Sequence, residues 1–267
     1  MKEKAFFTPQ EARKIGLEFE EPAPIACRWC GRPLTPLGAE LLGRVRWLMS
    51  EPCGCEGEIA ERARVESEQR AEYEKNVADK VLAAGVAKRF ASARTSIPEI
   101  GDFLLEFDRD GGNGLYISGG VGSGKTHAVS ALARALVYEG HSVVLTNTLA
   151  MLDSIQATYG RGKSQSGGVG RLAGCDLLIL DDMGKESGNG WALTTMFQVI
   201  NSRYEDMRPI VITSQYTLPA LVKRMGRAGE KESAEAIASR LCEMCDIVTL
   251  PDIDHRKPKG KPWPSGA

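Results

Sequence analysis

The sequence has neither an excess of one charge nor a long apolar run. Its 267 residues include 34 basic and 35 acidic side chains, for a formal net charge of -1. Bulk charge therefore gives no argument for nucleic-acid binding, although a local basic groove remains allowed. No stretch approaches the roughly 18 apolar residues that span a bilayer, and the first residues lack the apolar middle of a secretory signal. We therefore expect a cytoplasmic protein that does not contact a membrane.

Cysteine is scarce. The seven cysteines are an odd number, in a chain long enough to bury a core without disulfides. In a reducing compartment, clustered cysteines more often hold a metal ion, or nothing, than form disulfides. Four of the seven cluster near the N-terminus. Cys242 and Cys245 lie in an amphipathic stretch before the last apolar run, and we assign them to core packing.

The composition changes three times along the chain, which predicts four segments. Residues 1–55 are rich in proline and cysteine and form a small irregular module. Residues 56–84 lack proline and carry many charges, which favours a solvated connecting helix. Residues 85–253 form a larger domain. Residues 254–267 are basic and contain prolines, so we expect them to be disordered.

The larger domain is predicted to be α/β. Short apolar runs alternate with amphipathic stretches, as in a parallel sheet covered by helices. A Gly/Ser-rich loop is expected over residues 160–170. The five strand candidates are residues 115–118, 143–146, 177–181, 210–213 and 247–250.

The first strand candidate leads into a glycine-rich loop. Residues 119–126 read GGVGSGKT, which matches the phosphate-binding motif G-x-x-x-x-G-K-[ST] in a strand, loop and helix context. Glycines let backbone N–H groups surround phosphate oxygens, Lys125 brings a positive charge to the outer phosphates, and the Thr126 hydroxyl completes the coordination of Mg²⁺. The motif predicts that the chain binds ATP with Mg²⁺. The residues predicted to bind the nucleotide are Gly119, Gly120, Val121, Gly122, Ser123, Gly124, Lys125, Thr126, His127 and Asp181, with His127 as a first-turn helix residue and not a base.

A second motif lies further along the chain. Residues 177–182 read LLILDD, an apolar strand that ends in two carboxylates. At a phosphate site, Asp181 would reach the Mg²⁺ ion and Asp182 would orient or activate the attacking water. An apolar strand ending in Asp-Asp is a weak signal alone, because such ends often only enter a turn. Combined with Lys125 and Thr126, it predicts hydrolysis of ATP.

The clustered cysteines form two short pairs. Cys27 and Cys30 are followed, after 22 intervening residues, by Cys53 and Cys55. Four thiolates in this arrangement suit tetrahedral Zn²⁺, because each pair spans one edge of the tetrahedron. Free cysteines and an iron–sulfur cluster are the alternatives. Since the segment is too short to bury much core, the metal ion would supply its folding energy.

The phosphate motifs lie within a longer similarity. Its segments read GLYISGGVGSGKTHAVSALARAL, CDLLILDDMGKE, PIVITSQYTL and IASRLCEMCDIVTL. In their order and spacing, these segments resemble the AAA+ ATPases of the DnaC/DnaI type, the loaders of replicative helicases, over roughly residues 81–256. The related IstB-type transposition ATPases share most of the similarity. The resemblance implies an AAA+ P-loop fold that self-associates and hydrolyses ATP between subunits.

The resemblance also implies roles for single residues. Gln215 takes the sensor position after the fourth strand, where asparagine is usual. Arg240 would be the arginine finger that reaches the γ-phosphate on a neighbouring subunit, whereas without the resemblance it reads as a surface arginine in an ion pair. A helix at about residues 149–158 corresponds to the element that steers single-stranded DNA. The family packs the adenine ring at the positions of Val86, Ala87 and Phe90.

The resemblance implies that the chain loads a hexameric replicative helicase onto single-stranded DNA, in a phage or bacterial replication system. Loaders of this type often carry an N-terminal zinc module that docks on the helicase, as the cysteine pairs suggest here. Two alternatives stay open. One is an IstB-type transposition ATPase that binds duplex DNA, and the other is an ATP-binding adaptor that hydrolyses little and works as a switch.

Overall fold

The computed structural model describes residues 6–41, 43–108, 111–159, 166–185, 190–226 and 231–256. The chain forms two compact units, Met1–Glu74 and Lys75–Ala267. Within the described ranges, no helix is both long and apolar enough to cross a membrane.

The first unit is built from short elements. They are α1 (Pro9–Lys14), β1 (Glu18–Phe19), β2 (Ile25–Ala26), β3 (Pro33–Leu34), β4 (Pro36–Leu41) and β5 (Arg44–Ser50). Thr8 caps α1, because its hydroxyl accepts the N–H of Glu11 while the Glu11 carboxylate accepts the N–H of Thr8. One sheet has the order β1-β5-β4, and β2 and β3 form a separate antiparallel pair.

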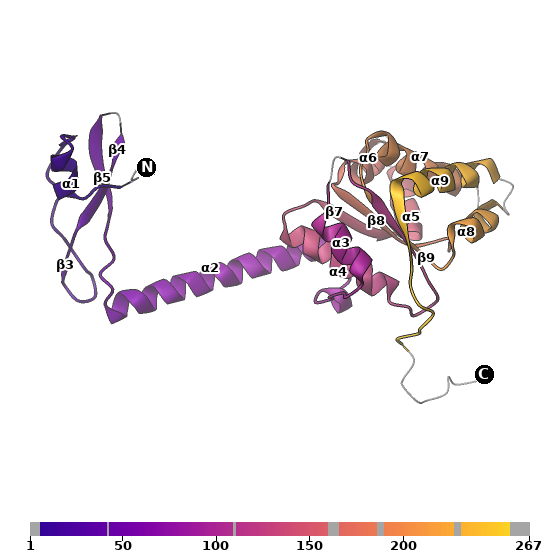
Figure 1. Cartoon of the computed structure of the whole chain (residues 1–267), viewed down its shortest axis with the longest axis horizontal. Coiled ribbons are helices and arrows are strands. Elements are labelled where there is room, and N and C mark those ends of the chain that lie inside the picture. The colour runs from indigo at the N-terminus through magenta and orange to yellow at the C-terminus, as the bar shows by residue number, and fades with distance from the viewer. Residues whose placement is uncertain are drawn as a thin grey trace. The chain divides into compact units, whose positions relative to one another are not determined.

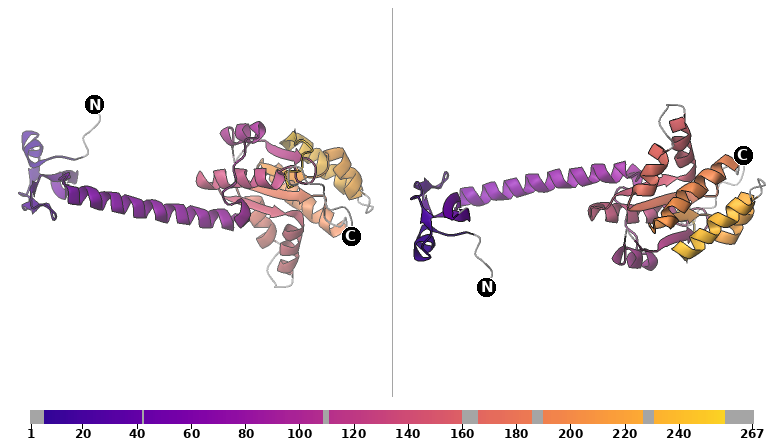
Figure 2. Two further views of the ribbon diagram at one scale, coloured as in Figure 1. Left: turned by 90° about the horizontal axis from the view of Figure 1, so that it is seen from below. Right: turned by 90° about the horizontal axis from the view of Figure 1, so that it is seen from above.

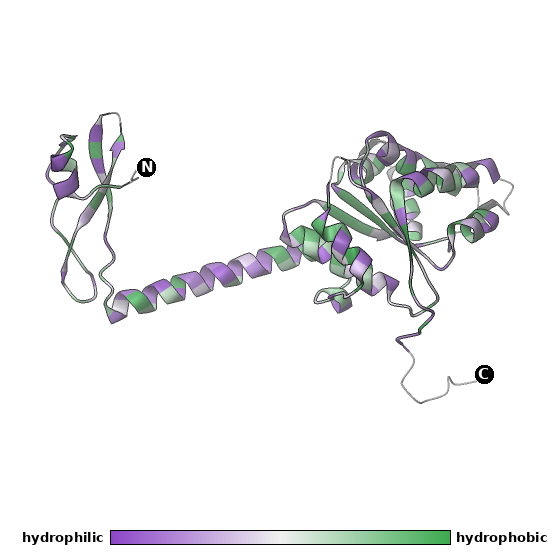
Figure 3. Ribbon diagram, in the orientation of Figure 1, coloured by the Kyte–Doolittle hydropathy of each residue, from purple (hydrophilic) through white to green (hydrophobic). Residues whose placement is uncertain are grey.

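The long helix α2 (Glu56–Ala83) is largely solvated, and the boundary between the two units falls inside it. Ion pairs one turn apart run along it, such as Arg64–Glu68 at 2.8 Å. Such pairs support a helix that has no broad apolar face. Figure 3 shows hydrophilic colours over most of α2. Near its C-terminal end, Val77 and Val81 are buried in the core of the second unit.

The second unit contains the five-stranded parallel sheet that the sequence predicts. Its strands are β6 (Gly114–Ser118), β7 (Val143–Asn147), β8 (Leu177–Met183), β9 (Ile210–Ser214) and β10 (Cys245–Thr249). Their order is β10-β6-β9-β8-β7, and every neighbouring pair is parallel. Because the carboxyl ends of parallel strands meet at one edge, the loops after β6, β8 and β9 gather there.

The two C-terminal cysteines differ in their surroundings. Helix α9 (Lys231–Met244) turns Ile237 and Leu241 into the core, so the next side chain, Cys242, is exposed. Cys245 begins β10 and is buried. The prediction of core packing is therefore confirmed for Cys245 and wrong for Cys242.

Helices cover both faces of the sheet (Figures 1 and 2). They are α3 (Pro98–Leu105), α4 (Lys125–Tyr138), α5 (Thr148–Tyr159), α6 (Ser166–Gly174), α7 (Gly190–Glu205), α8 (Leu218–Met225) and α9. Alternate strand residues point to opposite faces, so Leu178 and Leu180 pack in one core while Leu177 and Ile179 pack in the other. The first core is shared with α5 to α9, and the second with α3, α4 and the end of α2.

A buried arginine fixes helix α6. This helix begins at Ser166, inside the loop expected over residues 160–170, and residues 160–165 lie outside the described ranges. Arg203 on α7 is fully buried. Its guanidinium donates to the carbonyl oxygens of Leu172 at 2.9 Å, Cys175 at 3.0 Å and Pro209 at 2.6 Å. These bonds satisfy carbonyl groups around the end of α6 and tie it to the start of β9.

Candidate functional site

The glycine-rich loop joins β6 to α4, as the motif requires. Gly122 and Gly124 have φ angles of +81° and +94°, which glycine adopts without steric cost. Gly124 is the residue before α4, so the first N–H groups of the helix face the loop. A helix N-terminus preceded by such a loop is a ready site for phosphate.

Lys125 is buried at the base of this loop. It is 6% exposed, and its ammonium donates to the carbonyl oxygens of Gly119 and Gly120, both at 2.7 Å. Burial lowers the pKa of Lys125, and the nearby carboxylates of Asp182 and Asp181 act in the opposite direction. The side chain is thus held where the motif predicts a charge for the outer phosphates.

Thr126 and Asp181, the two residues predicted to hold Mg²⁺, lie next to each other. The Thr126 hydroxyl donates to Oδ2 of Asp181 at 2.9 Å, and the hydroxyl of Thr213 donates to Oδ1 at 2.5 Å. Burial raises the pKa of Asp181, while the two hydrogen bonds lower it. A hydroxyl and a carboxylate are oxygen ligands of the kind that Mg²⁺ prefers, so the residues present fit this ion.

Asp182 has an uncommon backbone conformation. Its φ angle is +60°, in the left-handed region that non-glycine residues rarely adopt. Its N–H donates to the Thr213 hydroxyl at 2.9 Å, and its carboxylate accepts from the Lys185 ammonium at 2.9 Å. The sequence did not single out Thr213 or Lys185. No local sequence pattern marks Thr213, because its partners Asp181 and Asp182 lie on the neighbouring strand β8.

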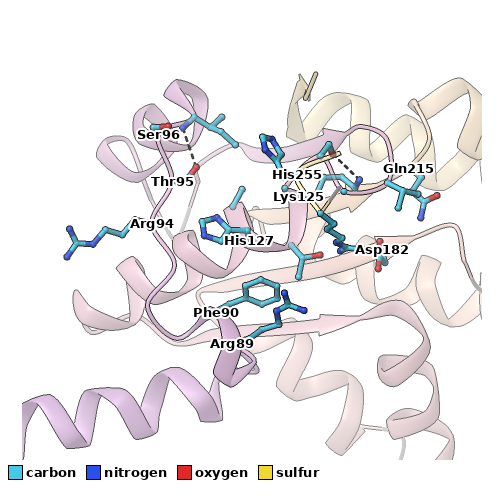
Figure 4. A pocket seen from close by; sticks show the side chains of 18 of the residues that line it. Arg89, Phe90, Arg94, Thr95, Ser96, Lys125, His127, Asp182, Gln215 and His255 are labelled. Carbon is cyan, nitrogen blue, oxygen red and sulfur yellow. Dashed lines mark hydrogen bonds between the residues drawn. The ribbon is translucent and has the colours of Figure 1, made fainter. Parts of the chain in front are cut away.

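A cavity of about 490 Å³ is lined by Lys125, Thr126, Asp182 and Lys185, among others. Figure 4 shows Lys125, His127, Asp182 and Gln215 around it, with Phe90 from the 3₁₀ helix η1 (Lys88–Phe90). Its volume is within the range of about 300–1,000 Å³ that is usual for small-molecule sites. Among the described residues that line the cavity, one is acidic, Asp182. Five are basic: Arg89, Arg94, Lys125, Lys185 and Arg256. The cavity therefore favours an anionic ligand.

The ring of Phe90 lies edge-on to His127, with 6.1 Å between the ring centroids. Of the three residues expected around the adenine, Phe90 lines the cavity. Val86 is buried in the core of the second unit, and Ala87 is exposed. Packing of Phe90 against the adenine stays a prediction, and so does the place of His127 among the nucleotide-binding residues.

The segment after β10 packs on the glycine-rich loop. The His255 N–H donates to the Gly122 carbonyl at 3.0 Å, and the Asp252 and Asp254 carboxylates occupy the space that Cβ atoms on Gly120 and Gly122 would need. His255 and Arg256 line the cavity. Residues 254–256, which the sequence assigned to a disordered tail, are therefore placed against the loop, and residues 257–267 lie outside the described ranges.

Gln215 and Arg240 are in different surroundings. Gln215 follows β9 and lines the cavity, as expected of a sensor position. Arg240 lies on α9, where its Nε donates to Oδ1 of Asn201 at 2.7 Å and its guanidinium covers the ring of Phe197 at 4.6 Å. Arg240 is not among the described residues that line this cavity. A role toward a neighbouring subunit remains a prediction.

The four N-terminal cysteines come together in the first unit. The sulfur atoms of Cys27, Cys30, Cys53 and Cys55 lie within 4.8 Å of one another. Cys27 and Cys55 are 3.7 Å apart, and Cys30 and Cys53 are 3.3 Å apart. A tetrahedral ion with metal–sulfur bonds of about 2.3 Å separates its ligands by about 3.8 Å, whereas a disulfide requires about 2.0 Å. The sulfur atoms are thus spaced to hold a metal ion.

The backbone around Cys27 favours the thiolate form. The N–H groups of Cys30 and Trp29 point to its sulfur and lower the pKa of Cys27 to about 7. The turn is closed by Gly31, whose φ angle is +72° and whose N–H donates to the Cys27 carbonyl at 2.8 Å. Trp29 packs on Gly57 in the first turn of α2, where a Cβ atom would collide with the indole. Trp29 nevertheless remains 43% exposed, so its packing on α2 is partial.

Known proteins share parts of this chain. A family model described as IstB-like ATP binding protein matches residues 104–261. The phage-like element PBSX protein XkdC of Bacillus subtilis (strain 168) is 28% identical over 149 residues, which are 50% of this chain and 48% of that protein. The replicative helicase loader DnaC of Escherichia coli (strain K12) is 23% identical over 125 residues, 46% of this chain and 51% of that protein. The chain spans about half the length of these curated relatives.

A solved structure shares the fold of the second unit. The crystal structure of the DnaC helicase loader matches with a TM-score of 0.54 and 24% identity, over 62% of this chain and 100% of that chain. The predicted α/β fold with a five-stranded parallel sheet is therefore confirmed. The family model covers more than half of the chain and includes the glycine-rich loop and both aspartates. The chain belongs to the family of IstB-like ATP-binding proteins.

Proposed function

We propose that the chain is an AAA+ ATPase that loads a hexameric replicative helicase onto single-stranded DNA. The observation that supports the ATPase activity is the grouping of Lys125, Thr126 and Asp182 around one cavity, with Asp181 hydrogen-bonded to Thr126. The relative named as a replicative helicase loader supports the biological part. The resemblance to AAA+ ATPases, which complete their sites between subunits, also supports self-association.

Each residue has a separate task in this proposal. Lys125 and the loop N–H groups bind the outer phosphates, and Thr126 with Asp181 holds Mg²⁺. When bound there, Mg²⁺ would supply positive charge that offsets the charge developing on the phosphates. Asp182 orients the attacking water and accepts its proton. Gln215 contacts the terminal phosphate, and Arg240 reaches the corresponding position on a neighbouring subunit.

The cysteine cluster supports a second part of the proposal. Four thiolates in closed tetrahedral spacing are typical of structural Zn²⁺, which would fold the first unit as a platform for the helicase. Helix α5, at the position of the family's DNA-steering element, would contact single-stranded DNA.

The proposal is tested with the tagged full chain expressed in the organism that encodes it, where its native partners are present. Mass spectrometry of the co-purified proteins is expected to find a hexameric replicative helicase in stoichiometric amounts, and a transposase in its place would support the IstB-type transposition role.

In a second assay, ATP turnover is measured with single-stranded DNA and with a duplex of the same sequence. We expect single strands to stimulate turnover and the Lys125→Ala variant to show none. Tight ATP binding without Lys125-dependent turnover would identify a switch in place of an ATPase.

A further inference from the structure

The carboxylate of Asp182 is neutralised by a lysine of its own chain. The Lys185 ammonium lies 2.9 Å from Oδ2 of Asp182, and both side chains line the nucleotide cavity. The left-handed backbone at Asp182 and its N–H bond to Thr213 fix the direction in which the carboxylate leaves β8. The carboxylate assigned to the attacking water thus already has a partner within its own chain.

The turn that carries Lys185 is held firmly. The Ser214 hydroxyl donates to the Met183 carbonyl at 2.7 Å, and Arg224 of α8 donates to the Gly184 carbonyl. Gly184 has a φ angle of +97° and packs so closely on Leu221 that a Cβ atom would collide with the leucine side chain. The backbone therefore presents Lys185 to the cavity, while its four-carbon side chain remains free to turn.

The ion pair between Lys185 and Asp182 is weak enough for another anion to replace the carboxylate. The side chains of Lys185 and Asp182 are 47% and 32% exposed. Pairs with such exposure change an equilibrium by about fivefold at most. A nucleotide triphosphate carries several negative charges, and its outermost phosphate would lie beside Lys125, on which the charge of Lys185 already acts. Such a phosphate competes with a single carboxylate for the Lys185 ammonium.

We propose that Lys185 is a positioning residue that couples ATP occupancy to Asp182. Without nucleotide, Lys185 neutralises the Asp182 carboxylate; with ATP, it turns to the terminal phosphate and leaves the carboxylate to the water. ADP lacks that phosphate, so the ion pair persists in the product state. This inference rests on the proposed ATPase function.

The test is a double-mutant cycle on binding affinity, measured by calorimetry with a non-hydrolysable ATP analogue, ADP and Mg²⁺. Lys185→Met is expected to weaken binding of the analogue about threefold to tenfold and to leave ADP binding unchanged. Asp182→Asn releases Lys185 and is expected to tighten analogue binding by a few fold. In the Lys185→Met background the same change is expected to tighten analogue binding less, because only the removed negative charge then contributes. Lys185→Arg, which keeps the charge, is expected to restore the preference for the analogue over ADP.

The matched control is Lys223→Met, on an exposed lysine of α8, which is expected to bind both nucleotides as the wild type does. Thermal melts of all variants show whether the fold is retained. An equal gain from Asp182→Asn in both backgrounds would overturn the coupling, because the gain would then come only from the removed negative charge. An equal effect of Lys185→Met on the affinities for the analogue and for ADP would also overturn the coupling. If the wild type binds no nucleotide, or if Lys125→Ala binds it equally well, the ATPase proposal fails first.

Discussion

The hydroxyl of Thr213 connects the two acidic residues at the end of β8. It donates to Oδ1 of Asp181 at 2.5 Å and accepts the N–H of Asp182 at 2.9 Å. Thr213 is completely buried, so neither bond is replaced by water if the hydroxyl is lost. One side chain on β9 thus orients both the residue proposed to hold Mg²⁺ and the residue proposed to orient water.

Thr213→Val is therefore expected to weaken binding of Mg²⁺ and ATP together. Valine has the same shape but leaves the Asp182 N–H without an acceptor and Asp181 with one fewer donor. We expect about a tenfold loss of affinity for ATP in the presence of Mg²⁺, as for one charge-assisted hydrogen bond. Thr213→Ser keeps the hydroxyl and should bind nearly as the wild type does. Calorimetric titration at several Mg²⁺ concentrations would measure both, and equal affinities for Val and Ser would refute the role of the hydroxyl.

Asp182→Asn is expected to keep nucleotide binding and to lose turnover. The amide cannot accept a proton from water, and loss of such a group costs about two or more orders of magnitude in rate. Phosphate release and nucleotide affinity are measured on the same preparation. Asp206→Asn, in the exposed turn after α7, is the control and should keep the wild-type rate. A loss of nucleotide binding that equals the loss of turnover would assign Asp182 to the metal or to the structure.

The cysteine cluster is expected to hold one Zn²⁺ ion per chain. Changing both Cys27 and Cys30 to serine removes two of four ligands and should abolish the metal content, as measured by elemental analysis of the purified chain. ATP turnover should be largely kept, because the second unit has its own core. Cys242→Ser, on the exposed face of α9, should keep the zinc. A wild-type chain that has an ordered first unit and no metal would contradict the assignment of a zinc site.

Arg240→Ala is expected to preserve ATP affinity and to lose turnover if the arginine acts on a neighbouring subunit. A mixture with Lys125→Ala should then recover activity, because an intact loop from one chain can meet an intact arginine from the other. Turnover per subunit should also rise with protein concentration. Concentration-independent turnover without rescue, and full activity of Arg240→Ala, would leave Arg240 with its observed partners Asn201 and Phe197.

Arg203→Met is expected to lower the free energy of unfolding by about 3–5 kcal/mol. The change removes a buried guanidinium and leaves the carbonyl oxygens of Leu172, Cys175 and Pro209 without that donor. Arg208→Met is the matched control: Arg208 is half-buried and donates to the Gly174 carbonyl through an exposed hydrogen bond. We expect it to cost less than about 1 kcal/mol. Urea denaturation compares the two, and similar costs would show that burial of Arg203 is not decisive.

The sequence predicts the features that depend on local patterns. Short apolar runs locate the five strands, and the loop that contains Lys125 and the strand that ends at Asp181 have spacings set by phosphate chemistry. The cysteine pairs are also local, since each pair needs only a tight turn. These features are visible because neighbours in sequence decide them.

Other features depend on partners far along the chain. Thr213 is an ordinary strand residue until β9 lies beside β8, and Arg203 reads as a helix arginine until its acceptors, some thirty residues earlier, are in place. Cys242 was misassigned because a single-residue step around α9 decides between core and solvent. Residues 254–256 read as a polar tail, and their position depends on a loop more than 120 residues earlier.

The fit of Asp252 and Asp254 against Gly120 and Gly122 bears on how this domain can be re-engineered. The phosphate motif itself accepts any residue at positions 120 and 122. A loop transplanted from another nucleotide-binding protein, with side chains at these two places, would push the C-terminal segment away while still satisfying the motif. Chimaeras of this domain therefore have to exchange the loop and residues 251–256 as one cassette.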